Sequence, residues 1–161
     1  MSDCINILGV NISTLTMQQT VKKALSFLED DKNHVVFTPN SEIIYEAYKN
    51  KDFADILNSS DINTADGIGV VYASKILKQP LAERVAGFDF LKELIKAAAP
   101  LNKKVFLFGS KPGVAQKAGE TLEKKYPGIV ICGMRNGYFK EEESVQIANQ
   151  IKESGADIVL V

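Results

Sequence analysis

Apolar positions along the chain follow two periods, one typical of helices and one typical of strands. Three- and four-residue spacing predicts helices at 17–28, 41–48, 52–58, 88–99, 114–126 and 141–154. Runs of β-branched and aromatic residues predict strands at 34–38, 61–64, 104–108, 129–132 and 156–161. This alternation is typical of an α/β fold, and we expect a Rossmann-like, mostly parallel sheet with helices on both faces.

Two stretches add detail to this outline. Residues 5–12 alternate apolar and polar side chains on both sides of Leu8 and Gly9, which fits either one strand or a small N-terminal hairpin turning near Gly9. The segment 68–77 is apolar nearly all round, so we expect its helix to be buried. The helices predicted to begin near 17 and 41 each have two suitable caps: Thr14 or Thr16, and Asn40 or Ser41.

Length and composition fit one globular domain. The chain has 161 residues, of which 45% are hydrophobic. Its formal net charge of −1 gives no concentrated basic face, so no nucleic-acid partner is expected. The N-terminus lacks the pattern of a signal peptide, and no apolar run reaches the roughly 20 residues of a membrane span. We therefore expect a cytoplasmic protein.

Several catalytic classes lack their residues. Cys4, Cys132 and the single histidine, His34, share no zinc-ligand spacing, and His34 is expected to be structural or exposed. No Asp-x-Asp pair follows a strand and no Gly-x-Ser-x-Gly occurs. We expect neither a metal site nor a cofactor.

Candidate chemistry gathers at predicted strand ends. Strands end at Thr38-Pro39-Asn40, Thr64-Ala65-Asp66-Gly67, Gly109-Ser110 and Val161. Ligands of parallel α/β sheets bind at the carboxyl ends of the strands, so we expect these segments to converge. Asp66 is either a general base or the cap of the helix that begins at Gly67, and the residue pattern fits both roles.

The other candidate positions each have two interpretations. Gly67 and Gly69 allow a diphosphate to approach the backbone, or serve a turn and helix packing. The turn 109–113 resembles a phosphate-binding turn, although an ordinary turn before a helix looks similar. Arg84 can pair with a phosphate or remain solvated, and Tyr138 can face a ligand or pack.

Four motifs occur in order along the chain: Thr38-Pro39-Asn40-Ser41-Glu42, Ala65-Asp66-Gly67-Ile68-Gly69-Val70-Val71, Glu83-Arg84-Val85-Ala86-Gly87-Phe88-Asp89 and Asn136-Gly137-Tyr138-Phe139. Together they resemble the WecG/TagA/CpsF family of glycosyltransferases, and most closely its TagA-like N-acetylmannosaminyltransferases of wall teichoic acid synthesis. The resemblance runs from Ile5 to Val161.

The resemblance implies an inverting enzyme that needs no metal. It would move N-acetylmannosamine from UDP-N-acetylmannosamine to the 4-hydroxyl of N-acetylglucosamine carried on undecaprenyl diphosphate. Asp66 would take the proton from that hydroxyl, and Thr38 would lie close to the sugar. The implied substrate-binding residues are Asn40, Gly67, Arg84, Gly109, Ser110, Gly137 and Tyr138. Arg84 would hold the donor or the leaving diphosphate. The nucleotide side would be lined by Gly109, Ser110, Gly137 and Tyr138.

The sequence departs from the family after its last strand. Family members continue into a Gly-x-Pro-x-Gln-Glu segment and a basic appendage that completes the active site and docks the enzyme on the inner face of the cell membrane. Neither is present, so we expect residues 1–161 to be a single glycosyltransferase core domain, truncated and weakly active or inactive. A homo-oligomer is a further expectation. The alternative is a non-catalytic nucleotide- or sugar-binding domain on the same scaffold.

Overall fold

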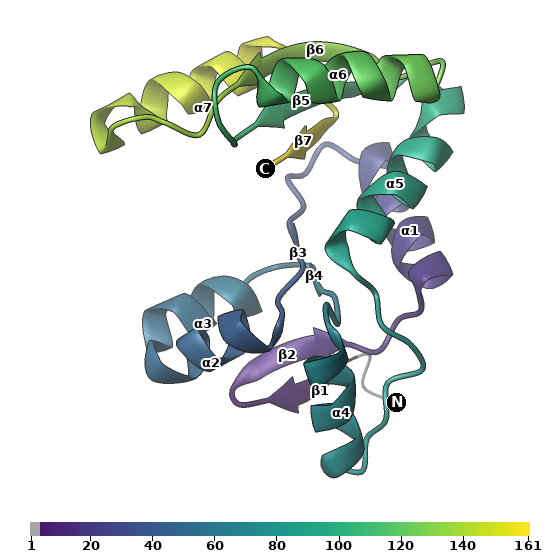
Figure 1. The fold of residues 1–161 in the computed structure, drawn as a ribbon, viewed down its shortest axis with the longest axis vertical. Coiled ribbons are helices and arrows are strands. Elements are labelled where there is room, and N and C mark those ends of the chain that lie inside the picture. Colours follow the sequence, from purple (N-terminus) through teal and green to yellow (C-terminus); the bar gives the residue numbers. More distant parts are fainter. Residues whose placement is uncertain (1–3) are drawn as a thin grey trace. The chain divides into compact units, whose positions relative to one another are not determined.

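The computed structural model describes residues 4–161, and its contacts divide the chain into two compact units (Figure 1). Unit 1 ends at Leu94, and unit 2 is Ile95–Val161. The boundary falls inside one helix, α5 (Gly87–Ala98). The single domain expected from the length of the chain stays a prediction.

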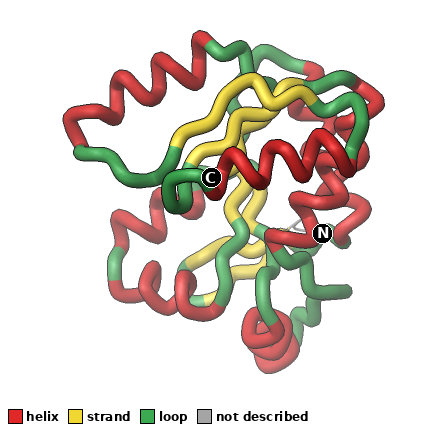
Figure 2. Tube along the Cα trace, turned by 45° about the horizontal axis from the view of Figure 1, so that its top comes forward, coloured by secondary structure: helices red, strands yellow, loops and turns green. Residues whose placement is uncertain are grey.

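Helices and strands alternate along both units, as Figure 2 shows by colour. Before α5, unit 1 contains β1 (Cys4–Ile7), β2 (Val10–Ser13), α1 (Met17–Ser26), η1 (Phe27–Glu29), β3 (Val36–Phe37), α2 (Ser41–Lys49), α3 (Lys51–Asn58), β4 (Ile62–Asn63) and α4 (Ile68–Ile76). After α5, unit 2 contains η2 (Ala99–Leu101), β5 (Lys104–Phe108), α6 (Val114–Lys125), β6 (Val130–Arg135), η3 (Glu141–Glu143), α7 (Ser144–Glu153) and β7 (Ile158–Leu160). The α/β class expected from the sequence is confirmed.

The N-terminal segment is a hairpin, which settles the first local alternative. Strands β1 and β2 pair antiparallel through a two-residue turn at Leu8 and Gly9. Both turn residues have positive φ, 51° and 92°, as the tight turns that suit the twist of a hairpin require. The Asn6 side chain supports the turn by accepting a hydrogen bond from the Gly9 N–H at 3.0 Å.

Side-chain caps fix where the first two helices begin. Thr16 caps α1 and forms a capping box with Gln19, so Thr16 rather than Thr14 has this role. Asn40 caps α2 through its side-chain oxygen, which accepts from the N–H groups of Glu42 and Ile43 at 3.0 and 2.9 Å. The Asn40 cap matters for the site, because it fixes the chain directly after β3.

The hairpin packs on α2, α3 and α4 to form the larger apolar core of unit 1. The core's buried side chains are Ile5, Ile7, Val10, Ile12, Ile44, Ala47, Leu57, Ala65, Val70 and Leu81. A second cluster joins α1 to the beginning of α5 through Ala24, Val85, Phe90 and Leu94. The two clusters anchor the segment 64–87, through Ala65, Val70 and Leu81 in the first and Val85 in the second. This segment carries most of the candidate residues of unit 1.

The helix α4 differs from its sequence prediction. Val70, Val71 and Ser74 are buried, but the opposite side of the helix exposes Ile68, Tyr72 and Ile76. The expectation of a fully buried helix is therefore wrong. The apolar composition of α4 favours burial of all its sides, but the local sequence does not show whether another element covers each side.

A histidine joins the beginnings of the short parallel strands β3 and β4. The His34 Nδ1 lies 2.9 Å from Asp61 Oδ1, and its Nε2 lies 3.1 Å from Asp30 Oδ1. The ring stacks on Phe27 with centroids 4.0 Å apart, and the His34 side chain is only 16% exposed. The structural interpretation of His34 is confirmed.

Unit 2 has a three-stranded parallel sheet in the order β6-β5-β7. The chain crosses from β5 to β6 in one direction and returns past β5 to β7. Right-handed crossovers therefore place α6 and α7 on opposite faces. The parallel pairing of the fold is thus distributed over two sheets, one in each unit, where the sequence led us to expect one.

Candidate functional site

The candidate residues of unit 1 follow two paired strands. Strand β3 leads into Thr38 and β4 leads into Thr64, and the Thr64 N–H donates to the Phe37 carbonyl at 2.9 Å. Because β3 and β4 are parallel, both segments leave the sheet at the same edge. The structure therefore brings the first two predicted strand ends together.

Asp66 binds the beginning of a helix that is distant in sequence. Its Oδ2 accepts a hydrogen bond from the Gly87 N–H, the first residue of α5, at 2.9 Å. The residue that caps its own helix α4 is Gly67, and that cap makes no side-chain hydrogen bond. Capping of α4 by Asp66 is therefore wrong. The half-buried carboxylate instead lies at the N-terminus of α5, where a negative charge is favoured.

Gly87 brings Thr38 to the same place. A Cβ atom built on Gly87 would lie 2.6 Å from the Thr38 Oγ1 and 3.0 Å from its Cβ. Only a residue without a side chain fits at this distance. Asp66 bonds the backbone of Gly87 and Thr38 packs against it, so the two residues implied to be catalytic are neighbours.

Asn40 and Gly67 lie beside this pair. A Cβ on Gly67 would lie 3.9 Å from the Asn40 Cβ, and Gly67 has a φ of 94° that favours glycine. The Asn40 side-chain oxygen is engaged in capping α2. Four of the predicted residues, Thr38, Asn40, Asp66 and Gly67, thus surround one strand edge of unit 1.

Arg84 stands in solvent near the same segment. Its Nη2 lies 3.7 Å from Asp89 Oδ2, and both side chains are about half exposed. Lys92, and to a lesser degree Arg84, hold the pKa of the Asp89 carboxyl below its ordinary value. An exposed pair of this kind contributes little to stability and is easily exchanged for another partner. Because the Arg84 side chain is also half exposed, its guanidinium is accessible to a ligand.

Three predicted residues of unit 2 are also brought together. The Gly109 N–H donates to the Arg135 carbonyl and the Gly137 N–H donates to the Ser110 carbonyl, both at 2.9 Å. A Cβ on Gly137 would lie 3.2 Å from the Gly109 Cα. Gly109 also lies beside the last residue, Val161, at the carboxyl ends of β5 and β7. The direction of the crossovers changes there, and parallel α/β sheets bind ligands at such a point.

Tyr138 does not pack. Its side chain is exposed, and its N–H donates to Asn136 Oδ1 at 2.9 Å. Phe139 takes the packing role instead, with its ring centroid 5.6 Å from that of Phe108. The Tyr138 ring therefore remains accessible near the carboxyl end of β6.

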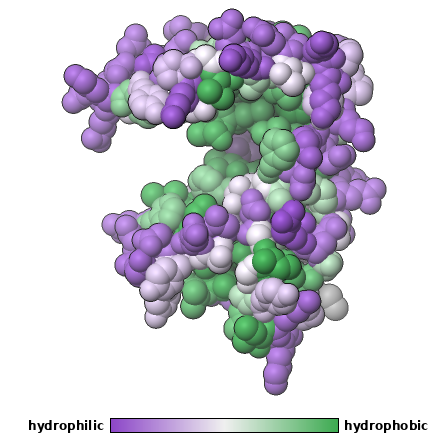
Figure 3. Space-filling model, in the orientation of Figure 1, coloured by the Kyte–Doolittle hydropathy of each residue, from purple (hydrophilic) through white to green (hydrophobic). Residues whose placement is uncertain are grey.

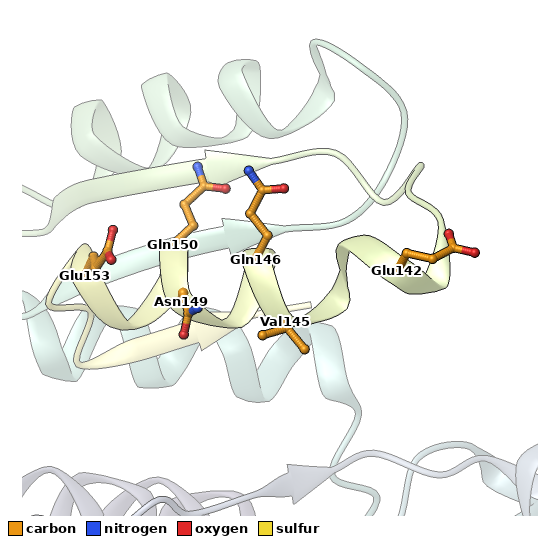
Figure 4. Close-up of a pocket in the computed structure, with 6 residues that line it drawn as sticks. All are labelled: Glu142, Val145, Gln146, Asn149, Gln150 and Glu153. Carbon is orange, nitrogen blue, oxygen red and sulfur yellow. The ribbon is translucent and has the colours of Figure 1, made fainter.

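A surface hollow of about 730 Å³ lies elsewhere in unit 2. It is lined by residues of η3 and α7: Glu142, Val145, Gln146, Asn149, Gln150 and Glu153. Figure 4 shows Gln146 and Gln150 projecting to one side of the helix and Val145 and Asn149 to the other. These side chains do not converge, and none is a predicted site residue. Among residues 4–161 no group of three or more His, Cys, Asp or Glu side chains could hold a metal.

Two residues near Asp66 were given no role of their own in the sequence analysis. Gly87 was part of a motif, but its contacts with Thr38 and Asp66 span 49 and 21 residues of sequence and leave no local signal. Thr64 is 1% exposed, and its hydroxyl has no hydrogen-bond partner within the described part of the chain. A buried threonine at the end of a predicted strand looks like any core residue in the sequence.

Comparison with known proteins supplies the family. The model of the glycosyl transferase WecG/TagA/CpsF family matches residues 5–161. The chain belongs to this family. The resemblance carried by the four motifs is thereby confirmed.

Curated relatives in the WecG/TagA/CpsF family are named N-acetylglucosaminyldiphosphoundecaprenol N-acetyl-beta-D-mannosaminyltransferase. The protein of Bacillus spizizenii is 35% identical over 136 residues, which cover 84% of this chain and 52% of the relative. That of Staphylococcus aureus is 33% identical over 159 residues, which cover 98% of this chain and 62% of the relative. The chain thus spans about half to three fifths of the length of these relatives.

Proposed function

We propose that this chain is the core of a glycosyltransferase that moves N-acetylmannosamine from UDP-N-acetylmannosamine to N-acetylglucosamine on undecaprenyl diphosphate. The names of the relatives support the transferred sugar and the acceptor. The observation that carries the proposal for this chain is the junction of Asp66, Gly87 and Thr38, since it places a carboxylate and a hydroxyl at one edge of a parallel strand pair.

The reaction follows from the chemistry of these groups. Asp66 accepts the proton of the acceptor's 4-hydroxyl while that oxygen attacks the anomeric carbon of the donor. The bond from the anomeric carbon to the diphosphate breaks, and UDP leaves with the bonding electrons. Attack from the face opposite the leaving group inverts the anomeric centre. A positioned general base contributes about 10²–10⁴-fold to such a step.

The remaining residues have binding roles in this proposal. Thr38 and Asn40 hold the sugar, and the exposed Arg84 pairs with the donor or with the leaving diphosphate. Gly67 keeps the backbone beside Asp66 open to a ligand. In unit 2, the close-packed backbone of Gly109, Ser110 and Gly137 with the accessible Tyr138 ring suits the nucleotide.

The test is release of UDP from UDP-N-acetylmannosamine in the presence of a short-lipid acceptor, beside the variant Asp66→Asn. A chain extended to the length of the relatives is measured in parallel, because this chain spans only part of them. Asparagine still accepts the hydrogen bond from Gly87, so the variant should fold. We expect a loss of about 100-fold or more, the low end for a lost base.

Three other outcomes are distinct. Release that survives the substitution would keep the transferase and remove Asp66 as the base. Calorimetric binding of the UDP-sugar without release by either chain would favour the non-catalytic binding domain. If neither chain binds the UDP-sugar or releases UDP, both the transferase and the non-catalytic binding domain are overturned.

A further inference from the structure

One face of α4 carries large apolar side chains in solvent. Ile68, Tyr72 and Ile76 are 60%, 58% and 80% exposed, and they recur at every fourth residue, so they share one side of the helix. Leu77, which ends the helix, is 47% exposed. We call these four residues the α4 face. Figure 3 shows hydrophobic surface in the region where Figure 1 labels α4.

The α4 face begins beside the candidate base. Ile68 follows Asp66 by two residues, and Phe88, which is 72% exposed, follows the Gly87 that donates to Asp66. Exposed apolar residues therefore follow both partners of the hydrogen bond between Asp66 and Gly87. A clustered apolar surface next to a site marks the approach of an apolar partner more often than chance exposure.

The charged residues of the stretch that forms the α4 face are all of one sign. From Gly67 to Ala82 the sequence contains no Asp or Glu, and its only charged residues are Lys75 and Lys78. The Lys75 Nζ lies 5.8 Å from the centroid of the Tyr72 ring. Apolar side chains, a tyrosine and flanking lysines without acidic residues are complementary to anionic lipid headgroups above an acyl layer.

We propose that the α4 face, together with Phe88, is a membrane-contact surface that lies on an anionic bilayer. The apolar side chains enter the boundary between headgroups and acyl chains, and Lys75 and Lys78 meet the lipid phosphates. This placement deepens the proposed function and in that respect rests on it, since it brings Asp66 to the surface where a lipid-linked acceptor resides.

A second copy of the chain fits the α4 face less well. In an isologous pair the same patch meets itself, so a contact across this face would bring two further lysines to a surface that carries no acidic residue between Gly67 and Ala82. Anionic headgroups supply the opposite charge and the second copy does not.

The test is cosedimentation of the protein with phosphatidylcholine vesicles that contain or lack phosphatidylglycerol. We expect partition onto the anionic vesicles, with a fall of about tenfold, or 1.4 kcal/mol, in Ile76→Gln as the buried apolar contact is lost. The matched control is Ile56→Gln, since Ile56 on α3 is 55% exposed but lies outside the α4 face. Lys75→Gln with Lys78→Gln should remove the preference for phosphatidylglycerol.

The outcomes separate this proposal from the proposed function, because sedimentation needs no turnover. Absence of partition by the parent chain, or equal losses in Ile76→Gln and Ile56→Gln, overturns the membrane-contact surface whether or not UDP is released. A change of mass by sedimentation equilibrium in Ile76→Gln with unchanged vesicle binding would make the face a self-association surface instead. If transfer occurs, Ile76→Gln should raise the KM for a vesicle-borne acceptor and leave that for a water-soluble acceptor unchanged.

Discussion

Gly87 is the residue through which the two implied catalytic groups of unit 1 meet. Replacement by alanine would place its Cβ 2.6 Å from the Thr38 Oγ1, so one of the two segments must shift. Overpacking of this kind costs about 1–3 kcal/mol. We expect Gly87→Ala to lower the free energy of unfolding by that amount, measured by urea denaturation.

The same position offers a double-mutant cycle. In Thr38→Ala the Oγ1 and Cγ2 atoms are removed, and the nearest remaining atom is the Cβ at 3.0 Å. Gly87→Ala should then cost less than in the parent protein, with a coupling of roughly 0.5–3 kcal/mol. Equal costs in the two backgrounds would show that the contact with Thr38 is not the cause.

At the scale of elements, two glycines that face opposite sides of the unit 2 sheet make a matched pair. Gly133 in β6 is opposite Phe106, and a Cβ there would lie 2.5 Å from the Cε2 of this buried ring. Gly119 in α6 has its nearest neighbours, Ile131 and Leu107, at an ordinary 3.5 Å. We expect Gly133→Ala to destabilise by about 1–3 kcal/mol. Gly119→Ala should stabilise by roughly 0.5–1 kcal/mol, because it removes a helix-interior glycine. Urea denaturation of both variants measures the sign of each change in the free energy of unfolding. A Gly133→Ala variant as stable as the parent would contradict the contact between the Phe106 ring and Gly133.

The elements themselves differ in how far sequence could predict them. Strand β5 occupies the predicted range 104–108, because a long apolar run in the middle of a sheet has no competing structure. Strands β3 and β4 shrink to two residues each, since their length is set by a partner strand that the local pattern does not contain. The prediction that α4 is fully buried was wrong for the same reason, because the local pattern does not contain the neighbour that would cover the helix. The strand edge that carries Thr38 and Asp66 could be predicted from parallel topology, but their junction at Gly87 depends on a tertiary contact.

At the scale of the whole molecule, the one histidine gives a pH dependence that belongs to a single unit. The hydrogen bonds to Asp61 foremost, and to Asp30, raise the pKa of His34 above its ordinary value of 6.5. The pKa values of the two carboxyls are lowered from 3.8, by the backbone N–H of Val35 and then His34 for Asp61, and by the N–H of Lys32 and then His34 for Asp30. The histidine's contribution is complete below pH 6.5 and is lost as the pH rises through its folded pKa. The contribution of the carboxylates is complete above 3.8 and is lost as the pH falls through theirs.

This cluster predicts where in the molecule the change occurs. His34, Asp30 and Asp61 all belong to unit 1, so the loss of charge on His34 between pH 5.5 and 8.5 should loosen the segments 30–37 and 60–66. Hydrogen exchange measured by mass spectrometry on the parent and on His34→Gln at each pH isolates the effect, since intrinsic exchange rates cancel between proteins at the same pH. The variant also loses the stacking on Phe27, but this loss is present at both pH values.

We expect the parent's extra protection over the variant to be larger at pH 5.5 than at pH 8.5 in segments 30–37 and 60–66, and unchanged with pH in peptides covering β5. Asp30→Asn should retain part of the pH dependence, because His34 keeps its hydrogen bond to Asp61. If the parent's extra protection over His34→Gln is the same at both pH values, His34 supports unit 1 through packing alone.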